Sequence, residues 1–164
     1  MILAIECLII CGIFTIVVLP AQYKNPIKYI MSYPPEIRKR VESLPQYETT
    51  IQEEEKEHIL KKIIAVLVFS AVLSAVAYFS GAKTFYTAFL HVFLLFFAVN
   101  IYDMLVLDLG VFCHSKKLRI PGTEDMDKEY KNYLFHVKGA LKGIAIGAVV
   151  SLVSACIVFM VSLV

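Results

Sequence analysis

Four long apolar runs, almost free of charge, alternate with charged segments along the 164-residue chain. The runs cover residues 2–19, 63–80, 85–111 and 140–164. A helix rises about 1.5 Å per residue and the hydrocarbon core of a bilayer is about 30 Å thick, so about 20 apolar residues span it. None of the runs alternates apolar and polar residues with a period of two, as membrane-spanning strands do. The pattern therefore predicts an all-α, polytopic integral membrane protein with four transmembrane helices.

The first charged segment, residues 21–62, ends in a pattern that is typical of a helix start. Thr50 and Glu53 have the spacing of a capping box, in which each side chain accepts a hydrogen bond from the other residue's backbone N–H. Two further glutamates follow, and they suit the positive end of a helix dipole. We therefore expect the second helix to begin near Ile51 and to run unbroken to Ser80, with its first part outside the bilayer.

The second charged segment, residues 112–139, predicts a similar extension of the fourth helix. A Pro-Gly pair turns the chain, Thr123 follows as a candidate N-cap, and acidic residues occupy the next positions. No proline interrupts the rest, so we expect one helix from about Glu124 to Val164. Both extensions, together with segment 21–62, then form a small cytoplasmic cap. The whole chain is expected to be one four-helix membrane domain.

The composition supports the same class. Hydrophobic residues make up 59% of the chain, and its mean hydropathy is +0.71. A soluble domain is about 45–50% apolar. The net charge of +2 and the lack of a Lys/Arg tract argue against a nucleic-acid partner. The lipid bilayer is therefore the partner that the composition predicts.

The sixteen Lys and Arg residues are distributed unevenly. Eight lie between the first and second runs, seven lie from the end of the third run into the fourth, and only Lys83 lies between the second and third. Cytoplasmic loops collect Lys and Arg, so segments 21–62 and 112–139 are expected in the cytoplasm. The N-terminus, the Lys83 turn and the C-terminus then lie outside. We expect the protein in the plasma membrane.

The third apolar run contains the polar residues that make the best candidate site. At 100° per residue, Asn100, Asp103 and Asp108 share one broad face toward the cytoplasmic end of the helix. A carboxylate that faces hydrocarbon costs at least about 2.5–3.5 kcal/mol, so we expect Asp103 to face the bundle interior or water and to have a partner. Arg119 follows the helix and lies within reach. These four residues are the candidates for binding a ligand or an ion, and no catalytic residue is assigned.

Two histidines suggest a further hypothesis for the same region. His114 lies at the exit of the third helix, and His136 lies about one turn before the fourth helix enters the bilayer. Together with Asp103 and Asp108 they can converge at the inner membrane surface. Carboxylates and imidazoles are ligands for a divalent transition metal and also a general-base arrangement. The simpler alternative, which we favour over a metal, pairs Asp108 with a basic residue such as Arg119 and makes the histidines ordinary interfacial residues.

Two polar residues lie nearer the outer ends of their helices. Glu6 is a turn or so from water in the first run, and we interpret it as an interfacial carboxylate, with an outer ion site as the alternative. His91 lies about one and a half turns inside the third helix and points away from Asn100 and Asp108. We interpret His91 as a hydrogen-bond donor between helices. Each of the two residues thus has a separate structural role in this prediction.

Small side chains recur at every fourth position of the fourth run. The members of this ladder are Gly139, Gly143, Gly147, Ser151 and Ala155. Such a stripe lets another helix approach closely, so that van der Waals contacts stabilise the pair. The partner helix can be internal, with the small residues around Ser70 and Ser74 of the second run as the match. A homodimer and another membrane protein are the alternatives.

Motifs of several enzyme classes are absent from the sequence. It contains no Gly-rich phosphate loop, no HExxH and no GxSxG. We therefore expect an ion- or small-ligand-binding or permeation protein whose polar site lies at the cytoplasmic end of the third helix. The alternatives are a membrane enzyme acting on a lipid headgroup or amphiphile at the inner leaflet, and a non-catalytic subunit or assembly factor. No cofactor is assigned, and a divalent metal is not favoured.

Overall fold

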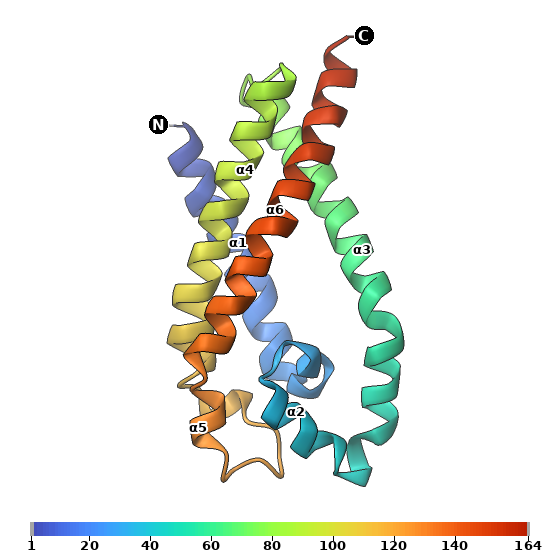
Figure 1. The fold of residues 1–164 in the computed structure, drawn as a ribbon. Helices are drawn as coiled ribbons and strands as arrows, with labels where there is room; N and C mark the ends of the chain where they lie inside the picture. The colour runs from blue at the N-terminus through green and yellow to red at the C-terminus, as the bar shows by residue number, and fades with distance from the viewer. Residues whose placement is uncertain (1, 164) are drawn as a thin grey trace.

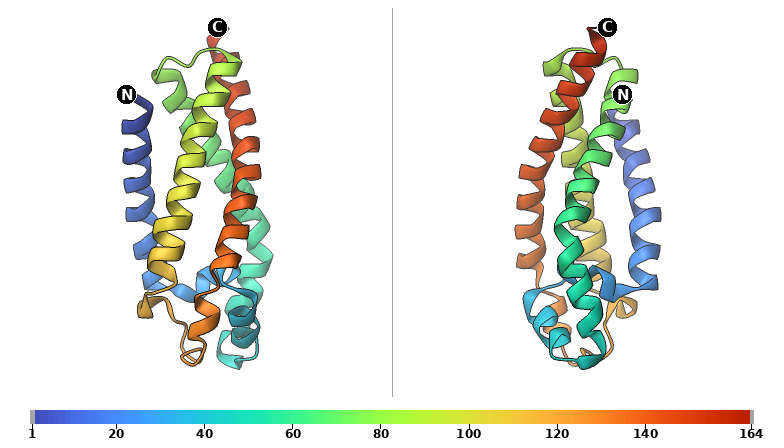
Figure 2. Two further views of the ribbon diagram at one scale, coloured as in Figure 1. Left: turned by 60° about the vertical axis from the view of Figure 1, so that its left-hand side comes forward. Right: turned by 90° about the vertical axis from the view of Figure 1, so that its right-hand side faces the viewer.

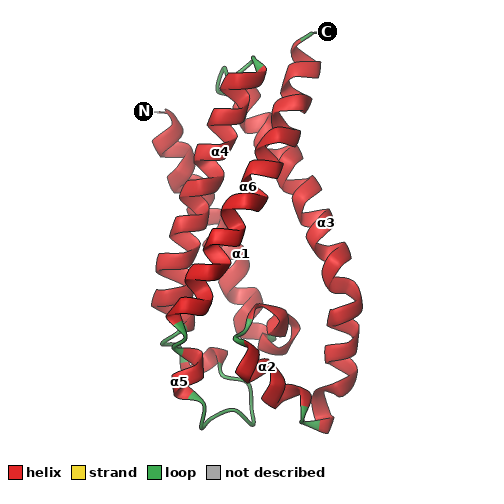
Figure 3. Cartoon of the chain, in the orientation of Figure 1, coloured by secondary structure: helices red, strands yellow, loops and turns green. Residues whose placement is uncertain are grey.

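The computed structural model describes residues 2–163, and within that range the chain is helical and contains no strand. Four α-helices are long: α1 (Ile2–Lys24), α3 (Glu48–Phe79), α4 (Phe85–Tyr102) and α6 (Tyr133–Ser162). The shorter elements are the α-helices α2 (Pro35–Glu42) and α5 (Asp127–Tyr130), the 3-10 helices η1 (Pro26–Ser32), η2 (Pro45–Tyr47) and η4 (Lys116–Leu118), and the π-helix η3 (Asp103–Phe112). Loops are confined to the connections between these helices (Figure 3).

Four helical stretches within residues 2–163 are long and apolar enough to cross a membrane. They are Ile2–Lys24, Pro45–Phe79, Phe85–Phe112 and Asp127–Ser162. The predicted all-α class and the four long apolar helices are therefore confirmed. Val164, the predicted end of the fourth helix, lies outside the described residues.

The long helices form an elongated bundle with two distinct ends (Figures 1 and 2). The start of α1, the α3–α4 turn and the end of α6 lie together at the termini end, whereas α2 and α5 lie at the opposite, cap end. Gly81 in the α3–α4 turn has a φ of +90°, a left-handed conformation that glycine adopts without steric cost. Helix α4 packs against both α1 and α6, and α6 also packs against α3.

Two separate clusters of buried side chains stabilise the two ends. The cluster at the termini end includes Leu73 of α3 and Val150 of α6. The other cluster lies in the cap, which comprises residues 26–51 and 112–130, and it includes Tyr130. The two clusters share no residue. Because full burial of one large apolar side chain contributes about 1.5–3 kcal/mol, each cluster stabilises its own end of the molecule.

The start of α3 differs from the prediction. The helix begins at Glu48 and not near Ile51, because the 3-10 turn η2 leads directly into it. Tyr47 occupies the N-cap position and no side chain caps the helix, so the predicted capping box of Thr50 and Glu53 is wrong. Ile51 is instead buried in the cap cluster. Tertiary burial of this residue therefore accounts for its position better than local capping does.

The predicted single helix from Glu124 is also wrong. The chain forms the short helix α5, turns, and only then starts α6. Asn132 is the N-cap of α6, and its side-chain oxygen accepts a 3.1 Å hydrogen bond from the backbone nitrogen of Phe135. Asparagine is among the best N-cap residues, which explains the break. Thr123 caps no helix, because its hydroxyl donates a 2.7 Å hydrogen bond to the carbonyl oxygen of Ile120.

The small-residue ladder of α6 faces α4. A Cβ atom added at Gly143 would overlap the side-chain amide oxygen of Asn100, and one added at Gly147 would lie 2.5 Å from the Phe96 ring. Gly139 differs, because nothing lies within 4 Å of its Cβ position. The ladder therefore makes an internal contact with α4, and the suggested match with α3 is not its main contact.

Helix α3 meets α6 through serine hydroxyls. The Ser154 hydroxyl donates a 3.1 Å hydrogen bond to the carbonyl oxygen of Ser70, and the Ser74 hydroxyl lies 3.4 Å from the carbonyl oxygen of Ser154. The last two ladder members, Ser151 and Ala155, are fully buried in the same half of the bundle. Toward the cap end α3 diverges from α6 (Figure 1). The candidate site lies in this half of the bundle, at the cap end, which is called the inner half below.

Candidate functional site

A π-helix carries the two aspartates of the candidate site. In η3 the backbone N–H bonds to the carbonyl five residues earlier, as in the 3.0 Å bond from Cys113 to Asp108. In an α-helix Asp108 would lie about 140° around the axis from Asp103. The wider π turn brings residues five apart closer to one face. Both aspartates consequently line the same cavity.

The cavity has a volume of about 620 Å³ and is lined by residues of α1, η1, α3, α4, η3 and α6. Its charged and imidazole side chains are Lys62, Asp103, Asp108, His136, Lys138 and Lys142. Asn100 also lines it, so three of the four predicted ligand-binding residues come together here. The sequence did not predict that the three lysines line this cavity. In the sequence they are only charges near the ends of the apolar runs, and the arrangement of α3 and α6 in the bundle is needed to bring them to the cavity.

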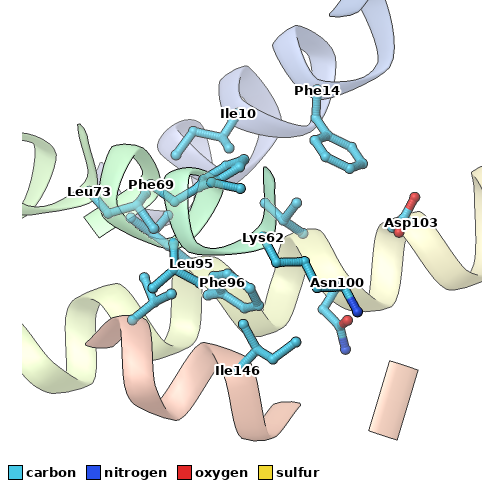
Figure 4. A pocket seen from close by; sticks show the side chains of 14 residues that line it. Ile10, Phe14, Lys62, Phe69, Leu73, Leu95, Phe96, Asn100, Asp103 and Ile146 are labelled. Atoms are coloured by element: carbon cyan, nitrogen blue, oxygen red, sulfur yellow. The ribbon is translucent and has the colours of Figure 1, made fainter. Parts of the chain in front are cut away.

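An apolar pocket of about 250 Å³ adjoins this cavity, deeper in the bundle. The two spaces share the lining residues Phe14, Lys62, Asn100, Asp103 and Ile146. Figure 4 shows the polar atoms of the shared residues gathered at one end of the pocket, with aliphatic and aromatic side chains around the rest. The site is therefore amphipathic: one compartment is apolar, the other is charged, and Asp103 lies where they meet.

Asp103 faces these cavities, as expected, but the expected partner is missing from residues 2–163. Its carboxylate accepts no hydrogen bond and lies within 4.0 Å of no basic group of the described chain. By contrast, Asn100 donates a 3.0 Å hydrogen bond to the carbonyl oxygen of Ala140. Lys62, Lys138 and Lys142 are exposed and form no ion pair within the described residues. Charges of both signs are thus available to a ligand.

Asp108 pairs with His136 and not with a basic residue beyond its helix. The carboxylate atom Oδ2 lies 3.1 Å from Nδ1 of His136. The imidazole is 3% exposed and packs edge-on against the rings of Phe112 and Phe135, with centroids 5.0 and 5.3 Å away. Its other nitrogen, Nε2, is buried and has no hydrogen-bond partner among residues 2–163. Nδ1 therefore has a carboxylate neighbour, whereas Nε2 is enclosed by protein without a polar partner among the described residues.

The four-residue metal site is not assembled. Nδ1 of His114 lies 3.0 and 3.1 Å from the carbonyl oxygens of Leu109 and Gly110, and the ring is exposed on the helix end. Within the described part of the chain, no group of three or more His, Cys, Asp or Glu side chains could hold a metal ion. The hypothesis that His114 joins His136 and the aspartates is therefore wrong, because its ring bonds to its own helix.

Arg119 lies in the cap and does not line either cavity. Its guanidinium carbon is 3.8 Å from the ring centroid of Tyr130, and the side chain is only 11% exposed. Nη2 donates a 3.2 Å hydrogen bond to the carbonyl oxygen of Cys113 and lies 3.4 Å from an Asp127 oxygen. These contacts give Arg119 a structural role in the cap. It is therefore no longer a candidate ligand-binding residue.

A second polar cluster, which the sequence did not predict, lies at the termini end. Oε2 of Glu6 on α1 is 2.8 Å from Nε2 of His91 on α4, and each side chain is 15% exposed. The Ser80 hydroxyl donates a hydrogen bond to the other oxygen of Glu6. The Glu6–His91 contact is an ion-pair contact without good hydrogen-bond alignment. The similar depth of Glu6 and His91 from the starts of their helices is the signal that could have paired them.

The inner site combines an apolar pocket, charges of both signs and an imidazole held by a carboxylate. Such an arrangement can hold an amphiphilic molecule. No protein-family model, curated protein or solved structure matches this chain.

Proposed function

We propose that this chain is an integral membrane protein whose inner half binds a small amphiphile. The four long helices span the bilayer, and the cap lies in the cytoplasm of a plasma-membrane protein, because 15 of the 16 Lys and Arg residues lie in the two segments that form the cap or in the helix ends that adjoin it. Helix α1 supports the insertion, because none of its described residues is buried. Its Leu8 and Ile16 are 75% and 74% exposed, so they need lipid around them.

The observation that carries the binding proposal is the junction of the two cavities at Asp103. Ligand pockets commonly have volumes of about 300–1,000 Å³ and apolar walls with a few polar groups. An ion alone needs no apolar compartment. A molecule with an apolar tail and a charged head would fill both spaces, with its tail against residues such as Leu95 and its head near Asp103. Within the class of binding and permeation proteins, the geometry therefore favours an amphiphile.

The proposal is tested by native mass spectrometry of protein released from a mild detergent. Ala65 is an exposed residue of α3 that lines the apolar pocket, so Ala65→Trp places a large ring in the tail space. Ala145 is exposed on α6 and lines neither cavity, which makes Ala145→Trp the matched control. We expect wild type and Ala145→Trp to retain an amphiphile and Ala65→Trp to lose it. A bare chain in every sample, or equal retention in both variants, contradicts the proposal.

The Asp108–His136 dyad favours a second candidate, an enzyme that acts on the bound head group. In this candidate His136, whose Nδ1 lies 3.1 Å from Asp108, takes a proton from water or from a ligand hydroxyl once Nε2, which is enclosed by protein, is exposed to the cavity. The mass of the retained amphiphile, followed over time, distinguishes a product from an unchanged ligand. If the enzyme candidate holds, His136→Gln stops the mass change while the amphiphile is still retained. An unchanged ligand in the wild type rejects the reaction and leaves the binding proposal intact.

A further inference from the structure

Positive and negative charges are separated along the chain at the cap end. Residues 7–35 and 109–123 contain no Asp or Glu, although both segments contain basic residues. Within the described residues, every carboxylate that forms an ion pair in the cap or at the start of α3 lies instead in segment 36–62 or 124–142. The first two segments therefore carry positive charge that has no carboxylate nearby in the sequence.

The fold brings these two segments together where α1 ends. The hydroxyl oxygens of Thr15 on α1 and Tyr102 on α4 lie 2.8 Å apart, and this contact fixes the register of the two helices. Helix α1 ends at Lys24, and η4, which follows the end of η3, packs against α1. Nζ of Lys117 on η4 lies 5.8 Å from the ring centroid of Tyr23. The two carboxylate-free segments thus meet at the cap-side boundary of the apolar helices.

Four exposed lysines surround this contact, and we call them the lysine patch: Lys24, Lys28, Lys116 and Lys117. The backbone nitrogen of Lys28 donates a 3.3 Å hydrogen bond to the carbonyl oxygen of Asn25, which keeps Lys28 within one turn of the end of α1. Within residues 2–163 none of the four forms an ion pair. None lines either cavity. The patch is therefore a surface separate from the amphiphile site.

We infer that the lysine patch binds an anionic phospholipid of the leaflet that adjoins the cap. Four or more basic residues directly beside the end of a spanning helix are typical of such binding. Each lysine near an anionic bilayer surface strengthens association about fivefold, a factor that corresponds to about 1 kcal/mol. Tyr23 adds a half-exposed amphipathic ring of the kind that lies at head-group level. Membrane insertion is the only premise that the patch shares with the amphiphile site.

A single fluorescent reporter tests the patch directly. The chain contains no tryptophan, so Tyr23→Trp introduces one indole beside Lys117. The protein is placed in vesicles of phosphatidylcholine and phosphatidylglycerol, and in turn one of the two lipids carries brominated chains, which quench tryptophan on contact. The two degrees of quenching give the preference of this position for phosphatidylglycerol. Tyr86→Trp, at an exposed position of α4 at the termini end, is the matched reporter.

The Tyr23→Trp reporter is expected to prefer phosphatidylglycerol at least about fivefold at low salt. In about 1 M salt, where the Debye length is about 3 Å, the preference is expected to fall toward one. The Tyr86→Trp reporter is expected to show a preference close to one at either salt concentration. Soluble glycerol phosphate, which carries the charged group without a tail, is expected not to displace the lipid at equal ionic strength.

Two fourfold variants of the Tyr23→Trp chain separate the patch from net charge. Substitution of the whole lysine patch by Gln is expected to reduce the preference to near one. The control removes the same charge from four other exposed lysines, each within three residues of a carboxylate in the sequence: Lys39, Lys56, Lys128 and Lys131. The control is expected to retain at least half of the preference. Monodisperse elution of each variant confirms that it is folded.

The other outcomes contradict the patch in distinct ways. Equal quenching by the two lipids at Tyr23→Trp overturns the lipid preference and leaves amphiphile binding intact. Equal losses in the two fourfold variants show attraction by net charge alone and overturn the patch. Displacement by glycerol phosphate overturns the phospholipid as the occupant. No quenching by either lipid shows that the end of α1 does not contact the bilayer, which overturns the patch together with the proposed insertion.

Discussion

The side-chain amide of Asn100 on α4 donates a 3.0 Å hydrogen bond to the carbonyl oxygen of Ala140 on α6. The bond requires a close approach of the two helices, which the missing side chain of Gly143 permits. Farther along the same pair of elements, Asp108 meets His136. The Asn100 contact therefore fixes the register that brings the inner site together.

Gly143→Ala is expected to destabilise the protein by about 1–3 kcal/mol, because the new methyl group overlaps the Asn100 amide. The matched control is Gly139→Ala, whose Cβ has nothing within 4 Å. The control is expected to be neutral, or stabilising by up to about 1 kcal/mol, since alanine favours a helix over glycine. Thermal unfolding in detergent measures both. Equal effects of the two substitutions would show that the ladder does not pack as described.

Glu6 and His91 are expected to be energetically coupled. Glu6→Leu and His91→Leu each leave a buried polar partner, which costs about 1–3 kcal/mol. The double variant leaves neither, so its loss of stability is expected to fall below the sum of the single losses by about 1 kcal/mol. A double-mutant cycle of thermal unfolding measures this coupling. Strictly additive losses would exclude the pair.

The Cys113 thiol is expected to react slowly in the folded protein. Burial raises its pKa to about 11, and the negative charge of Asp108 adds to the rise. The thiolate is the reactive form, and an unperturbed thiol has a pKa of about 8.5. A water-soluble maleimide at pH 8 should therefore label the unfolded chain much faster than the folded one. A variant that retains Cys113 as its only cysteine gives the measurement.

The same shift predicts how pH affects stability. The fold favours the neutral thiol, so the contribution of Cys113 to the free energy of unfolding is fully present below the ordinary thiol pKa and is lost as pH rises from about 8.5 toward 11.

The control for the labelling experiment is a cysteine at the exposed position Ser43 of an otherwise cysteine-free chain, which should react rapidly in both states. Rapid labelling of Cys113 in the folded state at pH 8 would contradict its burial.

Arg119 and Arg40 are expected to differ sharply in their tolerance of lysine. Arg119 stacks on Tyr130 with a side chain that is 11% exposed, and lysine cannot reproduce the planar stacking, so Arg119→Lys should cost about 1–3 kcal/mol. Arg40 pairs with Asp125 at the surface, where both side chains are largely solvated. Arg40→Lys should therefore cost less than about 1 kcal/mol. Thermal unfolding tests both, and a neutral Arg119→Lys would remove the structural role.

The sequence predicts the long helices because their signal is local. An apolar run of sufficient length needs no knowledge of its neighbours, and all four runs form helices. The ladder at Gly143 and Gly147 likewise predicts a close helix contact. Its partner is α4, and the ladder alone does not specify this, because small residues on α3 offer an equally good local pattern.

The polar contacts are harder to predict because each joins distant segments. An α-helical period predicts one broad face for the two aspartates, on which they lie about 140° apart, and the π-helix η3 brings them closer together than the sequence pattern indicates. Asp108 then reaches His136 on α6. Glu6 and His91 meet because α1 and α4 run in parallel at matching depth, which requires the order of the helices in the bundle.

The separation of the two buried clusters has a consequence for cooperativity. The cap cluster and the cluster at the termini end share no side chain, and the two cavities lie between them. Few packed contacts therefore transmit the loss of one cluster to the other, so the cap is expected to open as a unit at a lower free energy than global unfolding. A molecule that fills the cavities would contact both halves and merge their unfolding into one transition.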